Sequence, residues 1–299
     1  MGERMKATVA ICTHNRADDL REALLSLLRQ SFRGAYEIVV VDNGSTDHTR
    51  QVVEEFRAMV SVPVRYVHEA RLGLSVARNR AIREAKGEYV LFLDDDAMAS
   101  EHWIGEIVSL FERDPRIGCV GGKIDPVWEG GAPQWLPREN RTLYTILDYA
   151  DEIVEMREPA VPFGANIAFR KSIFDTMEPF REDLGRIGTN LLSGEESELI
   201  GRIRSRYAIY YTPHAWVLHK IPRSRANRRW LLRRIYWQGV SQAVSSGRKP
   251  KLFVLSLLKI PVFLLLSLVF LYDKRQIFRQ ISKIAYNNGL IRGVLRPRR

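Results

Sequence analysis

The chain has 299 residues, of which 45% are hydrophobic and 27% charged, the balance of an ordinary globular protein. Its two cysteines, Cys12 and Cys119, both fall in predicted strands, so we expect reduced, packed thiols and no disulfide framework. A strand is predicted almost at the N-terminus, which leaves no room for a signal peptide and favours an intracellular protein. The sequence contains no internal repeat, Walker phosphate loop or Gly-x-Gly-x-x-Gly fingerprint, which disfavours ATPases and dinucleotide-dependent dehydrogenases.

The N-terminal part alternates strand-like and helix-like patterns. Buried strands are predicted at 7–13, 36–42 and 64–68, and helices at 18–30, 45–57 and 74–86. Ser45 is the expected N-cap of the second helix, and Gly87 is expected to close the third. This alternation predicts an α/β fold with a mainly parallel sheet and helices on both faces. Ligands of such sheets bind beyond the carboxyl ends of the strands.

A fourth predicted strand, residues 89–93, runs directly into three consecutive carboxylates: Asp94, Asp95 and Asp96. Oxygen ligands at a strand end suit Mg²⁺ or Mn²⁺, which complete their shells with substrate phosphates and water. The alternative is an acidic turn that caps the next helix. Thr13 and Asp42 end two other predicted strands, so we expect them along the same edge of the sheet.

Several strings resemble the motifs of glycosyltransferase family 2, whose members have the GT-A fold. They are Ile11–Arg16 (Ile-Cys-Thr-His-Asn-Arg), Val41–Asp47 (Val-Asp-Asn-Gly-Ser-Thr-Asp), Gly73–Asn79 and Lys86–Asp96. The likeness covers residues 7–122 closely and resumes from about 163 to 219. It implies a GT-A sheet and inverting transfer from a nucleoside-diphosphate sugar, expected to be UDP-linked.

The resemblance also implies roles for single residues on the donor side. Asp42 would accept hydrogen bonds from the base or ribose, Asp94 would face the ribose, and Asp96 would ligate the metal that bridges the diphosphate. Three consecutive carboxylates cannot be sorted by sequence, so Asp95 shares these assignments. The expected nucleotide contacts are Thr13, Asn15, Arg16, Asp42, Arg78, Asp94, Asp95 and Arg223; the expected ligands of Mn²⁺ or Mg²⁺ are Asp96, Asp94 and His219.

Two positions depart from the family pattern. Cys12 stands where proline is common, and Asn43 stands where a second aspartate is common. The change at Cys12 is harmless. Asn43 keeps an acceptor oxygen and adds a donor, which leaves the choice of uridine open.

A second acidic cluster, Ser193–Leu199, lies at the start of a predicted amphipathic helix. It resembles the family's Gly-Glu-Asp-x-Glu-Leu, in which the aspartate is the general base. Glu196 holds that position here, and Glu195 is the second candidate. Both residue types are carboxylates, so the chemistry permits the exchange. The alternative is that acidic residues simply favour a helix N-terminus.

Residues 207–219 resemble the family's strand that ends in a metal-binding histidine, which is His219 here. An imidazole suits Mn²⁺ better than Mg²⁺. The basic segment Lys220–Arg225 follows, and its arginines match phosphate oxygens, although surface solubility explains the segment equally well. Together these parts imply inversion without a covalent intermediate.

From Lys220 onward the chain carries 19 lysine or arginine residues against one acid, Asp273, a formal charge of +18. Because the whole chain carries +11, residues 1–219 carry −7. A basic tail seeks phosphate on lipid or on nucleic acid. The 21 residues 252–272 are largely apolar and would span about 31 Å as a helix, which favours a membrane over nucleic acid.

The apolar segment has basic residues on both sides, so the positive-inside rule gives no direction of crossing. Lys259 is costly deep in a bilayer, and Pro261 is expected to break the helix. We therefore expect in-plane or re-entrant seating on anionic lipid, on the cytoplasmic face of the plasma membrane. A single span is the second interpretation, and a helix packed on the catalytic domain or in a homodimer is the third. Before it, residues 226–245 are predicted to form an amphipathic helix.

These patterns divide the chain into a catalytic domain at 1–222, with a nucleotide half at 1–122 and an acceptor half at 123–222, and a helical region at 223–299. Residues 125–162 are rich in proline and aromatic residues and form the expected acceptor-side loop, and Asn166 is expected to line the acceptor cavity. The expected acceptor is a prenyl-linked or other membrane-proximal glycan of a surface polysaccharide. The rival hypotheses are a metal-dependent nucleotidyltransferase, which lacks its glycine-rich loop here, and a non-catalytic scaffold that binds a membrane or nucleic acid.

Overall fold

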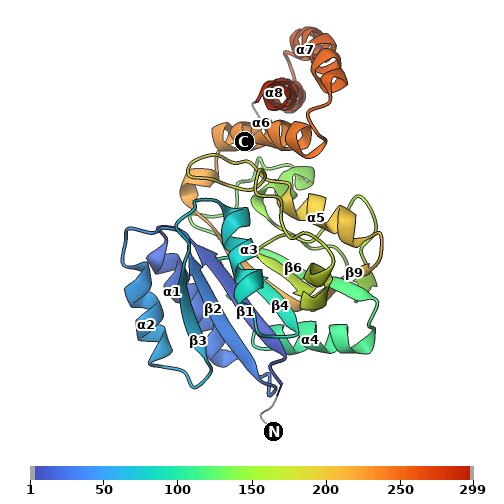
Figure 1. The fold of residues 1–299 in the computed structure, drawn as a ribbon. Helices are drawn as coiled ribbons and strands as arrows, with labels where there is room; N and C mark the ends of the chain where they lie inside the picture. The colour runs from blue at the N-terminus through green and yellow to red at the C-terminus, as the bar shows by residue number, and fades with distance from the viewer. Residues whose placement is uncertain (1–3, 297–299) are drawn as a thin grey trace.

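The structure, a computed structural model, describes residues 4–296, so the outermost ends of the predicted domains, 1–3 and 297–299, lie outside it. The described strands form one nine-stranded sheet in the order β3-β2-β1-β4-β8-β6-β9-β5, with β7 beside β9 (Figure 1). The strands are β1 (Ala7–Thr13), β2 (Tyr36–Asp42), β3 (Val64–His68), β4 (Tyr89–Leu93), β5 (Ala97–Ala99), β6 (Ile117–Trp128), β7 (Val154–Glu155), β8 (Asn166–Arg170) and β9 (Ala208–Ile221).

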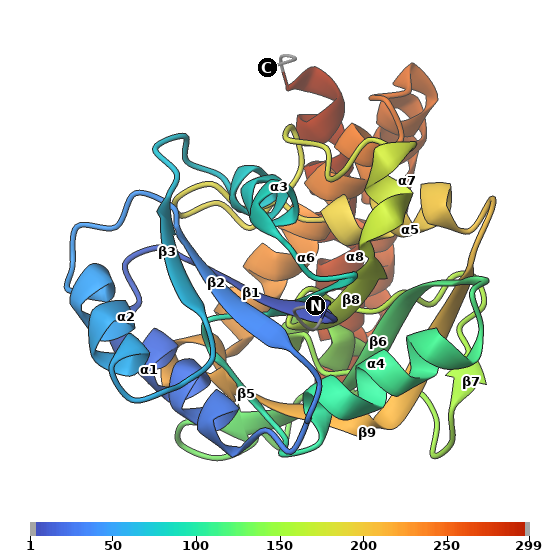
Figure 2. The same cartoon turned by 60° about the horizontal axis from the view of Figure 1, so that its bottom comes forward.

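Helices lie on both faces of this sheet. In the α/β part they are α1 (Ala17–Ser26), α2 (Thr49–Arg57), α3 (Leu74–Glu84), α4 (Trp103–Arg113) and α5 (Glu195–Ile203). The C-terminal ones are α6 (Arg228–Ser245), α7 (Pro250–Val269) and α8 (Lys274–Leu295). Short 3₁₀ turns are η1 (Leu27–Arg29), η2 (Arg138–Tyr144), η3 (Lys171–Asp175) and η4 (Arg223–Arg225). Figure 2 shows α3 on one side of the central strands and α1, α2 and α4 on the other.

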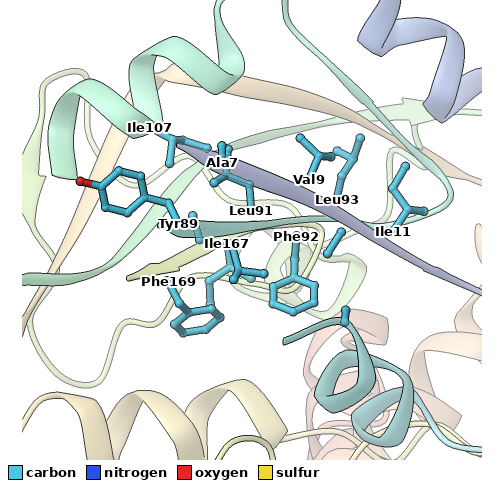
Figure 3. Packing of buried hydrophobic residues seen from close by; sticks show 14 of the residues in the cluster. Ala7, Val9, Ile11, Tyr89, Leu91, Phe92, Leu93, Ile107, Ile167 and Phe169 are labelled. Carbon is cyan, nitrogen blue, oxygen red and sulfur yellow. The ribbon is translucent and has the colours of Figure 1, made fainter. Parts of the chain in front are cut away.

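The central strands are buried on both faces, because alternate side chains enter two separate layers of core. On β4, Tyr89 points toward α4, where its ring stacks on Phe111 at 4.7 Å. Phe92 points the other way and meets Phe169 edge-on at 6.2 Å. Figure 3 shows these two layers on either side of the sheet. The continuous apolar runs of β1, β2 and β4 are therefore required by the double burial.

The predicted α/β fold is confirmed, and its sheet is mixed. β1, β2, β3 and β4 run parallel, whereas β8 is antiparallel to both β4 and β6. In this register Thr13 lies beside Asp42 at the carboxyl edge of the parallel strands. Both cysteines lie in strands as free thiols, as predicted, and burial raises the pKa of Cys12 to about 12.

Three local predictions are wrong. Ser45 does not cap α2, which begins at Thr49, because the Ser45 hydroxyl accepts a hydrogen bond from the backbone N–H of Asn15 at 2.9 Å. Gly87 is no helix cap, since α3 ends at Glu84. A Cβ on Gly87 would lie 2.3 Å from the backbone of β1, so a close approach of two chain segments requires the glycine. Pro261 does not break α7, which continues through it.

The predicted proline- and aromatic-rich loop, residues 125–162, packs against the C-terminal helices. The Tyr144 ring lies 5.1 Å from Trp128 and 4.7 Å from Trp230 of α6. Trp135 lies 6.3 Å from Phe278 of α8. The pairs Tyr144–Trp230 and Trp135–Phe278 join this loop to α6 and α8, so the loop and the C-terminal helices share a small apolar core.

The three C-terminal helices stand together at the end of the molecule opposite the N-terminus (Figure 1). α6 and α8 approach backbone to backbone: a Cβ on Gly239 would lie 2.1 Å from the Tyr286 carbonyl, and one on Gly289 would lie 1.9 Å from the Tyr236 carbonyl. α7 packs on α8 but keeps most of its apolar side chains exposed. Within residues 4–296, α7 is the one helix long and apolar enough to cross a membrane.

Candidate active site

The carboxyl edge of the parallel strands brings together the first group of predicted residues. The Thr13 hydroxyl donates to Asp95 at 2.8 Å. Arg16, at the start of α1, donates to Asp96 at 2.7 Å and lies 3.1 Å from Asp95. Burial raises the pKa of Asp95 to about 7, although Arg16 acts in the opposite direction. Two of the three consecutive carboxylates therefore share a single guanidinium.

His219, on β9, reaches the same acidic group. Its Nε2 lies 3.4 Å from Asp96, and both side chains are buried. Burial alone would raise the pKa of Asp96, but His219 and Arg16 hold it well below its usual range. Register explains the approach, because His219 pairs with Ala97 of β5, immediately after the acidic turn.

Asp42 ends β2 and is held from two directions. The Tyr66 hydroxyl donates to one carboxylate oxygen at 2.6 Å, and the backbone N–H of Ser45 donates to the other at 2.8 Å. The aspartate is nearly buried, so its orientation is fixed. Tyr66 was not predicted. Its place on β3, beside β2 in the sheet, is the sequence signal that points to it.

Arg78 joins the two predicted halves of the site. This buried residue of α3 donates to Glu196 at 3.0 Å and to Glu195 at 3.2 Å, both on α5. Its other terminal nitrogen lies 3.4 Å from Asp94. The backbone N–H of Gly164 also donates to Glu196, at 3.2 Å. The strand-end carboxylate and the helix-start carboxylates thus meet at one cation.

The two glutamates lie in different electrostatic environments. Burial, together with the neighbouring charge of Glu196, raises the pKa of Glu195 to about 8. Burial also acts on Glu196, but Arg78 lowers the pKa of that carboxyl below its usual value. The Glu195 side chain is 3% exposed and that of Glu196 is 16% exposed. Glu196 is therefore the ionised and more accessible member of the pair at neutral pH.

Three asparagines have structural positions. The Asn15 amide oxygen accepts from the backbone N–H of Thr46 at 2.7 Å, and the residue is exposed, with φ at 52°. The Asn43 side chain is buried against the loop before α3, donating to the Arg71 carbonyl at 2.8 Å. Asn166 was expected to line an acceptor cavity, but this is wrong: it is fully buried and bonded to Trp103, Lys123 and Ala215.

The basic segment Lys220–Arg225 was expected to place its arginines near phosphate oxygens, but its basic residues lie in different surroundings. Lys220 belongs to β9 and pairs with Glu22 at 2.6 Å, and Arg223 is exposed on the η4 turn. Arg225 instead lies toward the acidic edge, where its charge interacts with those of Asp95 and Asp96. Sequence alone does not separate two arginines of one short turn, because only their side-chain directions differ.

The predicted three-residue metal cluster is not assembled in the described part of the chain, where no three acidic, histidine or cysteine side chains are placed to hold one metal ion. Asp94 is turned toward Arg78, whereas Asp96 and His219 are paired. The Nδ1 atom of His219 is buried and has no hydrogen-bond partner among residues 4–296. One carboxylate and one imidazole fit Mn²⁺, which takes its remaining ligands from substrate oxygens and water.

The curled mixed sheet with its flanking helices has the GT-A fold. The family described as "Glycosyl transferase family 2" matches residues 8–177 of the sequence. The chain therefore belongs to glycosyl transferase family 2, and the predicted family and enzyme class are confirmed.

Two sequence relatives and one solved structure are similar to this chain. The glucosyl-dolichyl phosphate glucuronosyltransferase of Haloferax volcanii is 28% identical over 246 residues, which cover 80% of this chain and 77% of the relative. The succinoglycan biosynthesis protein ExoM of Rhizobium meliloti is 26% identical over 241 residues, covering 79% and 74%. A mannosyltransferase of Pyrobaculum calidifontis, solved with GDP-Man and Mn²⁺, has a TM-score of 0.64 at 19% identity, covering 97% of this chain and 87% of that one. This last likeness shows a shared fold.

Proposed function

We propose that this glycosyltransferase moves a sugar, with inversion, from a nucleoside-diphosphate sugar to a hydroxyl group of a lipid-linked glycan at a membrane surface. The observation that carries the proposal is the meeting of Asp94 and Glu196 at Arg78, because it sets a donor-side carboxylate next to a candidate general base. Building a surface polysaccharide is the process in which such a transfer is expected.

On the donor side, Asp42 and Asp94 contact the nucleoside, and Asp96 with His219 holds the divalent ion. The 3.4 Å approach of the His219 Nε2 atom to the Asp96 carboxylate and the lowered pKa of Asp96 support this assignment. A divalent ion bound there supplies positive charge for the departing diphosphate. Arg16 and Arg225 add fixed positive charge beside Asp96. The side-chain amide of Asn43 forms hydrogen bonds with the backbone of Arg71 and Gly73, so Asn43 does not select the nucleobase directly.

On the acceptor side, Glu196 takes the proton from the acceptor hydroxyl while that oxygen attacks the anomeric carbon. The new glycosidic bond forms as the bond to the nucleoside diphosphate breaks on the opposite face. The lowered pKa of Glu196 keeps it ionised for this task, and Arg78 and Gly164 orient its carboxylate. Glu195, with its raised pKa, serves as a neutral neighbour.

The helical region supports a membrane location on the cytoplasmic face. α7 exposes leucines along most of its length, and basic residues flank it at both ends. A groove of 1270 Å³ lies between residues 134–143, α6 and α8, lined by Arg228, Arg275, Arg279 and Lys283 beside Trp135 and Phe278. Aromatic rings next to cations suit the headgroup layer of an anionic membrane. Peripheral seating on the membrane is the arrangement that we propose, with a single span as the second interpretation.

Calorimetric titration tests the donor site. UDP, GDP and dTDP are added separately to the full chain, with and without Mn²⁺, and to the Asp96→Ala variant. We expect one nucleotide to bind in a metal-dependent way and the variant to lose that dependence, because a ligand of the ion is removed.

Asp18→Ala is the matched control, since this aspartate of α1 is 92% exposed and lies outside the site. It should bind like the wild type. If no nucleotide binds under any condition, the donor-site proposal fails. If Asp96→Ala binds normally with Mn²⁺, the assignment of Asp96 as a metal ligand is wrong.

A further inference from the structure

Three arginines beside the acidic site lack the partners that buried cations usually have. Arg186 precedes α5 by a short loop, Arg225 ends η4, and Arg234 lies on α6. All three are partly buried. Within residues 4–296, none of them forms an ion pair with a carboxylate. Partly buried guanidinium groups that form no direct ion pair leave donors unsatisfied, and a bound anion stabilises a site of this kind.

Arg234 shows this most clearly. One terminal nitrogen lies 3.2 Å from the Ser193 hydroxyl and 3.4 Å from the Leu191 carbonyl, which are neutral acceptors. Its Nε is buried and has no hydrogen-bond partner in the described part of the chain. Burial, with the repulsion of nearby Arg186, lowers the pKa of Arg234 to about 10. The residue stays charged at neutral pH and keeps a donor free.

The cluster extends from the donor acids to the candidate base. The charge of Arg225 interacts with Asp95 and Asp96, whereas that of Arg186 interacts with Glu195. Arg234 interacts with Glu195 and Glu196, and its partner Ser193 directly precedes the turn into α5. The Arg186 and Arg234 end of the cluster therefore lies beside the two glutamates of α5, which the proposed function assigns to the acceptor side.

From this arrangement we infer that Arg186 and Arg234, with Arg225 beside them, bind a phosphate group of the acceptor, the phosphate that joins its glycan to the lipid. The inference rests on the proposed function and names its acceptor class. Phosphate oxygens accept several charge-assisted hydrogen bonds at once, which suits two arginine forks. α6 carries Arg234 and packs on α8 next to the exposed α7, so a lipid-borne phosphate reaches the cluster from the membrane side.

The donor's diphosphate is a second source of the same chemistry, and the experiment separates the two. Farnesyl phosphate and farnesol are titrated into the full chain in detergent micelles, and UDP, GDP and dTDP with Mn²⁺ are titrated in parallel. The variants are Arg234→Gln and Arg186→Gln. Arg233→Gln is the matched control, because this neighbour on α6 is exposed and donates to the Thr189 carbonyl at 2.8 Å, away from the glutamates.

We expect farnesyl phosphate to bind more tightly than farnesol. Each cluster variant should weaken farnesyl phosphate about 10- to 100-fold, because a charge-assisted hydrogen bond is lost. Nucleotide affinity should stay within about two-fold of wild type, and Arg233→Gln should change neither ligand. Thermal unfolding of each variant, and Arg234→Lys as a variant that keeps the charge, separate a binding loss from misfolding.

Three results would overturn the inference. The first is equal binding of farnesyl phosphate and farnesol by the wild type. The second is farnesyl phosphate binding that the cluster variants leave unchanged. The third is a loss of nucleotide affinity with farnesyl phosphate unaffected, which would assign the arginines to the donor's diphosphate. If no nucleotide binds the wild type, the donor proposal fails, while the phosphate-dependent contrast still decides the role of the cluster.

Discussion

Arg78 lies 3.0 Å from Glu196, in a contact that joins helix α3 to helix α5. The same guanidinium contacts Glu195 and Asp94. A single buried cation thus contacts three carboxyl groups, from β4's end and from the start of α5. Loss of the Arg78 cation would leave the buried carboxyl groups around it without a counter-charge, which is costly. Arg78 therefore holds Asp94 and Glu196 in position relative to each other.

The choice between the two glutamates can be made by turnover. Glu196→Gln should lower kcat by about 100- to 10,000-fold, because the amide cannot accept the acceptor's proton. Nucleotide affinity should be retained, since Glu196 is not a proposed nucleotide contact. Glu195→Gln should lower kcat far less. The reverse order of the two variants would identify Glu195 as the base.

The pH dependence of stability provides a separate test of Glu195. Its pKa rises from 4.5 in the unfolded chain to about 8 in the folded protein, so the folded state binds the proton more tightly. The contribution of Glu195 to the free energy of unfolding is therefore largest below about pH 4.5, and it decreases as the pH rises toward 8. Melting temperatures measured from pH 4.5 to 8.5 should fall less in Glu195→Gln than in wild type. Parallel curves would contradict the assignment of a raised pKa to Glu195.

Gly164 is required by the contact of Arg78 with Glu196. A Cβ at this position would lie 1.7 Å from an Arg78 nitrogen and 2.7 Å from the Glu196 carboxylate. Because Arg78 is buried and held by three carboxylates, it cannot move aside without breaking those contacts. Gly164→Ala should therefore lower kcat at least about ten-fold and reduce the free energy of unfolding by about 1–3 kcal/mol.

The control for that substitution is Gly105→Ala on α4, where the added Cβ meets an ordinary contact at 3.9 Å. It should leave activity unchanged and slightly raise stability, because alanine is the better helix former. Wild-type kinetics in Gly164→Ala would show that the site relaxes around the methyl group.

Membrane association depends on the exposed face of α7. Leu258 and Leu265 are 66% and 63% exposed, so replacing both with aspartate costs little core packing. Binding to vesicles that contain phosphatidylglycerol should fall at least about ten-fold, because apolar area no longer enters the lipid. Nucleotide affinity should not change. Sedimentation with vesicles measures the loss, and Leu25→Asp on α1, also partly exposed, is the matched control.

Much of the fold could be predicted because buried parallel strands are continuous apolar runs. β1, β2 and β3 match their predicted bounds for this reason. Helix ends were less predictable. Ser45 has the residue type of an N-cap, but a tertiary contact with Asn15 uses its hydroxyl, and no local pattern carries that information.

Some residues of the candidate site could likewise be predicted from the sequence, and others could not. The pairing of Asp96 with His219 agrees with motif order, although the two lie far apart in the sequence. Asn166 was misplaced, because the sequence does not show that Trp103 and two carbonyl groups satisfy its amide. Arg186 and Arg234 belong to no motif and could not be predicted. Only the folded chain brings their loop and helix beside α5.

The backbone contact between α6 and α8 at Gly239 and Gly289 leaves no room for the two helices to hinge. If α7 rests on a bilayer as proposed, the catalytic edge is held at a constant height above the lipid headgroups. A hydroxyl tethered too near or too far from its anchoring phosphate would miss Glu196. The enzyme would then select its acceptor by length, because only lipid-linked chains of one length would place a hydroxyl next to Glu196.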